Sequence, residues 1–235
     1  MLKLYKCINL IKAGQETTST TLRWLLLLLA KYPVVQQRVF DEIDRVVEHR
    51  EPNYAHRAQM PYTDSVLNEA MRFGSIVPLA PHVVVSPVTI GDFELPVDTI
   101  VLGNLYAILH DPKVWPDAEH FNPEANFPTA VSSDEERELL ACRMQSFIPF
   151  SVGKRVCLGE TLARQELFIF FVGLMQRFRV AASPEHPLPS GYLGTHGITR
   201  APMAFKVLFI RRRGWYFRSI EFLFEMDVTV SGIEF

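Results

Sequence analysis

The chain has 235 residues, 48% of them hydrophobic, and its 24 basic and 26 acidic residues give a formal net charge of −2 at pH 7. A chain of this length can bury a sizeable core in one or two domains, and its near-neutral charge carries no electrostatic signature of nucleic-acid binding. The three cysteines, Cys7, Cys142 and Cys157, are widely spaced and odd in number, which argues against a disulfide framework and indicates a reducing compartment.

The first predicted element is a helix from about Ile8 to Lys31. Its longest apolar run, Trp24 to Ala30, is bounded by Arg23 and Lys31 and falls short of the roughly 20 apolar residues needed to cross a bilayer. We therefore expect no membrane-spanning segment, and we expect no signal peptide.

Within this helix the run Ala13 to Thr20 reads A-G-Q-E-T-T-S-T. Gly weakens a helix interior, and Thr can bond back to the preceding turn, so one interpretation is a kink or groove beside Glu16 and Thr17. Such a groove could hold a diatomic ligand and supply it with protons. The other interpretation makes Thr17 or Thr18 the N-cap of a helix that carries Leu22 to Leu29.

Pro33 separates this helix from a second one, from about Val34 to Glu48. Its apolar residues recur at helical spacing opposite acids and bases, which predicts a helix with one buried face. These apolar residues are Val35, Val39, Ile43, Val46 and Val47.

A third helix is predicted from about Thr63 to Phe73. It carries Glu69 and Arg72, whose spacing of three places carboxylate and guanidinium on one face. Taken alone, such a pair is typical of an exposed salt bridge that contributes about 0.2 to 1 kcal/mol.

The middle of the chain alternates between short strands and loops. A short helix is expected near Asn104 to Leu109, followed by a meandering loop from Trp115 to Ile148 with one polar helical turn at Asp134 to Cys142. A proline-containing loop, with Pro184, Pro187 and Pro189, comes late in the chain. The predicted strands are Val83 to Val85, Val88 to Ile90 and Thr99 to Leu102.

The most informative run is Phe150 to Gly159, F-S-V-G-K-R-V-C-L-G, at the start of an apolar helix predicted from Leu158. Gly153 and Gly159 let the backbone approach a flat ligand and take unusual turns. A helix N-terminus favours the thiolate of Cys157 over the thiol, and Arg155 offers a planar fork of donors for a carboxylate.

These properties suit a haem iron with a cysteine ligand and an arginine-paired propionate. The alternative is a buried structural cysteine in a glycine-containing turn. The helix is apolar nearly all round in its second half, so we expect it to be central to the core. The apolar residues concerned are Leu162, Leu167, Ile169, Phe170, Phe171, Leu174 and Met175.

The Cys157 run fits F-x-x-G-x-R-x-C-x-G in full and resembles the haem-binding loop of the cytochrome P-450 family, in particular its microsomal animal branch. The run at Ala13 resembles the family's oxygen-binding helix, A-G-x-[DE]-T-T, and the E-x-x-R pair lies between the two in the family's order. The resemblance covers about Ile8 to Arg212, with Thr199 to Ile210 similar to the closing β-hairpin region. It implies a mainly α fold with a small β-sheet component, the C-terminal portion of the cytochrome P-450 fold.

The resemblance also implies roles for individual residues. Cys157 would be the axial ligand of the haem iron, and the Cys157 loop would bind the haem with Gly153 and Gly159. Arg155 and His82 would contact propionates, and Phe150 would shield the thiolate. Glu16 and Thr17 would relay protons to iron-bound dioxygen, while Glu69 and Arg72 would form a structural pair under the haem.

The activity so implied is a haem-thiolate monooxygenase that inserts one oxygen atom of dioxygen into a small, apolar organic substrate. No flavin or dinucleotide motif is present in the sequence, so electrons would come from a separate flavin-containing NADPH reductase docking near Lys154. By resemblance the enzyme would lie on the cytoplasmic face of the endoplasmic reticulum membrane. Two alternatives stay open: a truncated fragment without turnover, and a haem-thiolate isomerase or dehydratase that acts on peroxides.

Two features depart from the family. Ala125 stands where many members carry an arginine that completes a triad with the Glu69 and Arg72 positions, so this pair must rely on itself or on backbone groups. We assign residues 1–213 to the family domain and leave 214–235 as a tail without assignment, either a native segment or the product of an altered reading frame. Complete members extend further on the N-terminal side, so we expect exposed apolar faces here.

Overall fold

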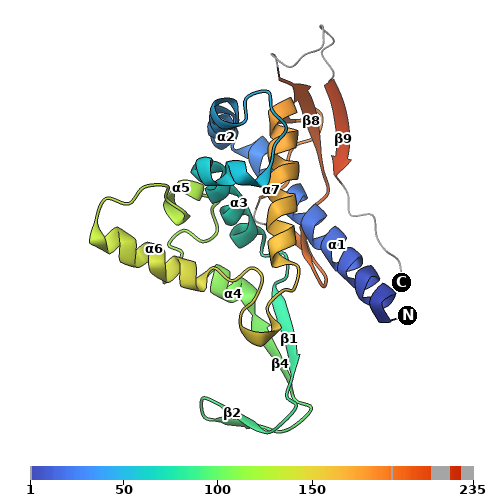
Figure 1. The fold of residues 1–235 in the computed structure, drawn as a ribbon, viewed down its shortest axis with the longest axis vertical. Coiled ribbons are helices and arrows are strands. Elements are labelled where there is room, and N and C mark those ends of the chain that lie inside the picture. The colour runs from blue at the N-terminus through green and yellow to red at the C-terminus, as the bar shows by residue number, and fades with distance from the viewer. Residues whose placement is uncertain (1, 192, 213–222, 229–235) are drawn as a thin grey trace.

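A computed structural model describes residues 2–191, 193–212 and 223–228 (Figure 1). The fold is mainly helical with small antiparallel sheets, as predicted. Its α-helices are α1 (Leu2–Lys31), α2 (Pro33–Val46), α3 (Pro61–Gly74), α4 (Leu105–Leu109), α5 (Pro123–Asn126), α6 (Asp134–Ser146) and α7 (Glu160–Arg177), with 3₁₀ turns η1 (Tyr54–Gln59) and η2 (Gly153–Arg155). None of the helices in these three ranges has the length and apolar character needed to cross a bilayer.

The strands form short antiparallel pairs at two ends of the molecule. The ribbon β1–β4, with the β2–β3 hairpin, extends from one end in Figure 1, and a sheet in the order β5-β8-β9 lies at the other. β6 pairs with β7. The strands are β1 (Leu79–Val83), β2 (Val88–Ile90), β3 (Phe93–Leu95), β4 (Ile100–Asn104), β5 (Phe178–Ala182), β6 (Gly194–His196), β7 (Arg200–Pro202), β8 (Phe205–Arg211) and β9 (Leu223–Val228).

The main core lies where α1, α2, α3 and α7 meet the sheet that begins with β5. Trp24 to Leu29 are all buried, and so is every one of the five apolar residues predicted for the inner face of α2. A second, smaller core gathers around Trp115 and joins Met71 of α3 to Leu167 of α7. The helical periodicity therefore identified the buried face of α2 correctly.

The first helix begins earlier than predicted and is continuous through the threonine-rich run. Thr17 lies in the middle of α1, so the interpretation of Thr17 or Thr18 as an N-cap is wrong. The Thr17 hydroxyl instead donates back to the Ala13 carbonyl at 2.8 Å. This is the back-bonding that Thr makes when its own helix continues on both sides.

The other predicted elements need smaller corrections. α6 is a full helix of 13 residues, longer than the predicted single turn. A capping box between Ser133 and Glu136 stabilises its N-terminus by satisfying backbone N–H groups of the first turn. The first strand begins at Leu79, and β3 was missed. Thr199 to Ile210 does not form one hairpin, because β7 pairs with β6 while β8 pairs with β5 and β9.

The helix after Cys157 is buried on one side only. Leu167, Phe171 and Met175 lie in the core, whereas Leu162, Ile169 and Phe170 are exposed, Phe170 by 57%. The helix is central to the core, as expected, but its apolar surface is not covered all round among the residues that the structure describes. Of the tail, β9 is described and adds a strand to β8, while the rest of 214–235 lies outside the described residues.

Gln36 links the helical layer to the sheet. Its side-chain amide donates to the carbonyls of Leu29 and Val180 at 2.9 and 2.8 Å, and its Oε1 accepts from the Val180 N–H at 2.8 Å. The Gln36 side chain is buried, so water cannot reach these backbone groups to form the same hydrogen bonds in its absence.

We expect Gln36→Ala to lower the free energy of unfolding by about 2 to 5 kcal/mol, since it leaves three buried polar groups unpaired. The neighbouring Gln37 is exposed and donates to Asp41 one turn along the same helix, so Gln37→Ala should change stability by less than about 0.5 kcal/mol. Urea denaturation of the two variants measures the difference; equal effects would contradict the linking role of Gln36.

Candidate functional site

A cavity of about 370 Å³ lies between α1 and α7, and Cys157 forms part of its lining. One wall is a single face of α1, with Leu10, Ala13, Gly14, Thr17, Thr18 and Thr21. These positions recur every three or four residues, as a helical face requires. The opposite wall comes from the Cys157 loop and the first two turns of α7, and α3 adds Met71. The cavity is therefore mainly apolar with a few hydroxyls on one side.

The loop that carries Cys157 is shaped by two left-handed residues. Ser151 has φ 64° and Gly153 has φ 78°. The Cys157 N–H donates to the Phe150 carbonyl at 3.0 Å, which closes the loop on itself. The thiol is free and exposed, and it stands immediately before the N-terminal turn of α7, which begins at Glu160.

The two glycines of the loop, Gly153 and Gly159, have different structural environments. A Cβ at Gly153 would meet no atom within 4 Å, so glycine serves the left-handed backbone there. A Cβ at Gly159 would lie 3.8 Å from Leu10 Cδ1 and 3.9 Å from Cys157 Sγ, which is ordinary van der Waals contact. Gly159 thus marks the close approach of α1 to the sulfur, although a methyl group would still fit.

Arg155 lies on η2 and lines both this cavity and a separate pocket of about 440 Å³. The separate pocket also contains His82 from β1 and Lys154, set among valines of β1 and its neighbours. Arg155 and His82 are 73 positions apart in the sequence, and the fold brings both to this pocket. The two cations Arg155 and Lys154, with the hydrogen-bonding imidazole of His82, suit the carboxylates of an otherwise apolar ligand.

Phe150, the first residue of the Cys157 loop, is half-buried in the cavity wall and lies against α7. The guanidinium of Arg164 lies 4.9 Å from its ring centroid, a cation–π contact, and Arg164 is also paired with Glu160 at 2.9 Å. The aromatic ring is therefore held against the start of α7, close to the cysteine.

The structure separates the two residues expected to relay protons. Thr17 lines the cavity, but Glu16 does not. The Oε1 atom of Glu16 instead accepts from the hydroxyls of Thr20 at 3.2 Å and Thr199 at 3.4 Å, so its carboxylate faces the β6–β7 hairpin.

The cavity lining also includes polar residues to which the sequence analysis gave no role in the site, among them Thr18, Thr21 and Glu166. Thr18 is buried, and its hydroxyl has no hydrogen-bond partner among the described residues. Thr21 could have been found from its spacing, because it lies four residues after Thr17 and therefore on the same face of the helix. For Glu166 the signal was its place one turn after Leu162 on the face of α7 that begins beside Cys157.

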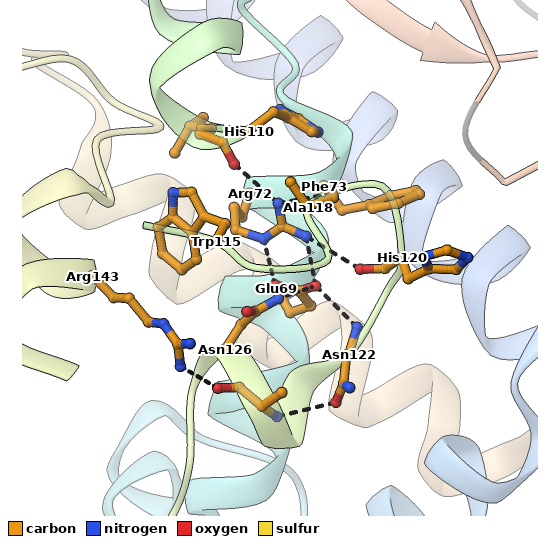
Figure 2. A network of polar contacts seen from close by, with 12 residues as sticks. Glu69, Arg72, Phe73, His110, Trp115, Ala118, His120, Asn122, Asn126 and Arg143 are labelled. Carbon is orange, nitrogen blue, oxygen red and sulfur yellow. Dashed lines mark hydrogen bonds and ion pairs between the residues drawn. The ribbon is translucent and has the colours of Figure 1, made fainter. Parts of the chain in front are cut away.

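Glu69 and Arg72 are fully buried, unlike the exposed pair that their spacing alone suggests (Figure 2). Arg72 donates to both carboxylate oxygens of Glu69, at 2.7 and 2.8 Å. Its remaining donors reach the carbonyls of Leu109, Ala118 and His120. The guanidinium therefore ties α3 to the end of α4 and to the loop after it.

The carboxylate of Glu69 is also supported by α5. It accepts from the Asn122 N–H and from the Asn126 side-chain amide, both at 3.0 Å. Burial raises the pKa of Glu69, and the donors of Arg72, Asn122 and Asn126 oppose that rise. Such a pair is tolerated in the interior because all five N–H groups of the Arg72 guanidinium and both carboxylate oxygens of Glu69 have hydrogen-bond partners.

The missing arginine at Ala125 is compensated from α6. The guanidinium of Arg143, buried, donates to the Ala125 carbonyl and to the Val114 carbonyl, the latter at 3.2 Å (Figure 2). Arg143 does not bond to Glu69 directly but holds the backbone of α5, which does. The sequence analysis missed Arg143, because it lies 18 residues beyond Ala125 in a segment expected to be mostly loop.

A free thiol in the lining of an apolar cavity, just before a helix, suits the cysteine ligation that haem-thiolate proteins use. The chain belongs to the cytochrome P450 family: the family model described as Cytochrome P450 matches residues 3–209. Members of this family bind haem through a cysteine thiolate.

Several relatives support this membership. The chain is 47% identical to rat (Rattus norvegicus) cytochrome P450 2J3 over 173 residues, which cover 73% of this chain and 33% of that protein. It is 42% identical to human (Homo sapiens) cytochrome P450 2J2 over 202 residues, which cover 85% of this chain and 38% of that protein. The chain thus spans 33% and 38% of the length of these two relatives.

A solved structure of a zebrafish cytochrome P450 with abiraterone is 39% identical and superposes with a TM-score of 0.75, covering 86% of this chain and 45% of that one. A second zebrafish structure, with progesterone, has a TM-score of 0.73 at the same identity and covers 84% of this chain and 44% of that one. The fold is therefore that of a portion of a cytochrome P450.

The residues present fit a haem on observations of this structure. The cavity is lined by the free thiol of Cys157 at one side and by small residues of α1 at the other. Small residues permit close approach of a flat ring. Arg155 and His82 sit in the adjoining pocket, where they suit propionates. Cys157 would supply the axial sulfur, and its thiol is free and exposed.

We expect Glu69→Ala to lower the free energy of unfolding by about 3 to 5 kcal/mol, because it leaves the Arg72 charge buried without its counter-ion. Arg137 and Asp134 have the same spacing of three but are exposed, so Arg137→Ala should cost less than about 1 kcal/mol. Chemical denaturation compares the two. A small loss for Glu69→Ala would show that the buried pair does not brace the fold.

Proposed function

We propose that this chain is the haem-bearing part of a cytochrome P450 monooxygenase, which inserts one oxygen atom of dioxygen into a small organic substrate. The observation that carries the proposal is the free thiol of Cys157 in the lining of an apolar cavity at the N-terminus of α7. When haem is bound, it supplies the oxygen chemistry, and a cysteine ligand favours O–O cleavage.

The chain's own residues would perform four tasks. Cys157 would bind the iron through its sulfur, as a thiolate ligand. Arg155 and His82 would hold propionates by charge-assisted hydrogen bonds. Phe150 would keep water from the sulfur. The apolar lining, including Ile76 and Val77, favours an apolar substrate.

Proton delivery would be divided between two residues of α1. Thr17 lies in the cavity lining, where its hydroxyl can hold a proton close to a bound ligand. Glu16 lies outside the lining and is anchored by Thr20 and Thr199. A proton held on Glu16 would therefore reach the cavity only by a turn of its side chain or through water.

Electrons would come from a separate flavin-containing NADPH reductase. Lys154 is exposed in the Cys157 loop and offers positive charge to an acidic partner surface. By family membership, the complete enzyme would lie on the cytoplasmic face of the endoplasmic reticulum membrane.

A second candidate is a fragment that binds haem without turnover, or that fails to bind it. The observation that favours this candidate is the combination of short coverage and exposed apolar faces. The chain spans 33% to 41% of the length of its relatives. Leu158, just before α7, and Phe170, within it, are exposed by 94% and 57%. Faces of this kind are usually covered by further protein.

The deciding experiment is the absorption spectrum of the chain after haem addition, reduction and exposure to carbon monoxide. We expect a red-shifted carbon monoxide band in the unchanged chain and its loss in Cys157→Ala, since only the thiolate ligand shifts the band. Cys142 is likewise free and exposed, but on α6, so Cys142→Ala is the matched control and should keep the band.

Three other outcomes would redirect the proposal. A band that survives Cys157→Ala would refute the assigned ligand. Absence of the band from the unchanged chain would support the fragment without function. Turnover of an organic peroxide without any reductase would favour a haem-thiolate isomerase or dehydratase instead.

A further inference from the structure

Arg200, on β7, is buried to 1% exposure beside the cavity and was not singled out by any sequence motif. A buried guanidinium is costly unless its donors are satisfied. The bonds it makes therefore indicate which part of the fold it stabilises.

The first set of bonds is to the end of α3. Nη1 of Arg200 donates to the carbonyls of Phe73 and Gly74, at 2.9 and 2.7 Å. These are among the last carbonyls of the helix, which lack partners within it and carry the negative end of its dipole. Arg200 thus acts as a C-terminal cap supplied from a strand more than a hundred residues away.

The second set of bonds fixes the turn that leads out of α3. Ser75 takes a left-handed conformation with φ 39°, and the next carbonyl, that of Ile76, accepts from the Arg200 backbone N–H at 2.8 Å. The far end of this turn is held by the Tyr106 N–H, which donates to the Pro78 carbonyl at 3.1 Å. Residues 75–78 are therefore fastened at both ends.

Aromatic side chains enclose the guanidinium. Its central carbon lies 4.7 Å from the Trp24 ring centroid and 5.5 Å from that of Tyr106, and the Trp24 indole N–H donates to the Arg200 carbonyl at 3.2 Å. Arg200 therefore connects α1, α3, α4 and β7 in one cluster.

This cluster has little room for adjustment. A Cβ on Gly74 would come within 3.1 Å of Trp24 Cδ1 and 3.2 Å of Ile76 Cδ1, so backbone and side chains are already in close contact there. Ile76 and Val77 in turn line the cavity. A movement of the turn would be passed directly to the cavity wall.

We propose that Arg200 is a positioning residue that sets the size selectivity of the cavity by fixing the turn that carries Ile76 and Val77. This inference depends on the proposed function in one respect, since it takes the cavity to be the substrate-binding site. Arg200 does not line the cavity itself and acts through the two apolar residues.

The test uses Arg200→Met, which keeps the length and apolar stem of the side chain but removes its donors, and Arg200→Lys, which keeps the charge without the planar fork. Hydrogen exchange in the chain without haem is the first readout. We expect backbone amides in residues 75–80 to exchange about 10- to 100-fold faster in Arg200→Met. Arg200→Lys should fall between, and it provides a folded variant if methionine prevents folding.

The second readout is ligand size in the haem-loaded chain, titrated with N-alkylimidazoles from N-methyl to N-octyl and followed by absorbance. We expect the ratio of Kd values for the butyl and octyl compounds to change by about tenfold in Arg200→Met. Such a change in preference is not expected from a loss of stability alone, which would leave the ranking of ligands intact.

Arg212 offers a matched control. It also donates to helix-terminal carbonyls, those of Met175 and Gln176 on α7, and lies 4.1 Å from the Phe40 ring centroid, but it does not line the cavity. Arg212→Met should lower Tm without changing exchange in 75–80 or the ligand ranking.

Unchanged exchange and an unchanged ranking in Arg200→Met and Arg200→Lys would overturn the inference and leave Arg200 a purely structural cation. If no imidazole binds even to the unchanged chain, the proposed function fails, while the exchange measurement still decides whether Arg200 holds the turn.

Discussion

The structure depends on the buried ion pair between Glu69 and Arg72. Neither charge reaches water, so each must be satisfied by protein, and together they gather backbone groups from α3, the end of α4, the loop after α4 and α5. The pair does not line the cavity itself. It fixes the position of α3, and Met71, next to Arg72 on that helix, packs in the second core and lines the cavity. A polar cluster thereby determines the shape of an apolar space.

The cavity wall is built from two helices with different contributions. α1 presents small residues and threonines, and its back-bonded hydroxyls leave the helix continuous. α7 contributes its first two turns beside the Cys157 loop, and farther along the same face Ile169 and Phe170 are exposed. The same helix thus borders the cavity at its N-terminal end and leaves an uncovered apolar surface farther along, which agrees with a chain that spans less than half of its relatives.

Local patterns predicted the features that local physics controls. The amphipathic face of α2, the helix around Glu69 and the turn at Gly153 all arise from residues close in sequence. The orientation of Glu16, the support from Arg143 and the cap formed by Arg200 do not, because each joins segments far apart in the chain, and 183 positions separate Glu16 from Thr199. The extent of α7 burial was overestimated for a related reason: periodicity shows which residues are apolar, but not whether the chain contains a partner to cover them.

The two left-handed residues at Ser151 and Gly153 have a consequence for ligand affinity. The backbone that presents the sulfur is bent during folding, so the conformational entropy of shaping it is lost before any ligand arrives. A metal that binds Cys157 then meets a preorganised donor, and less of its binding free energy is consumed in ordering the chain.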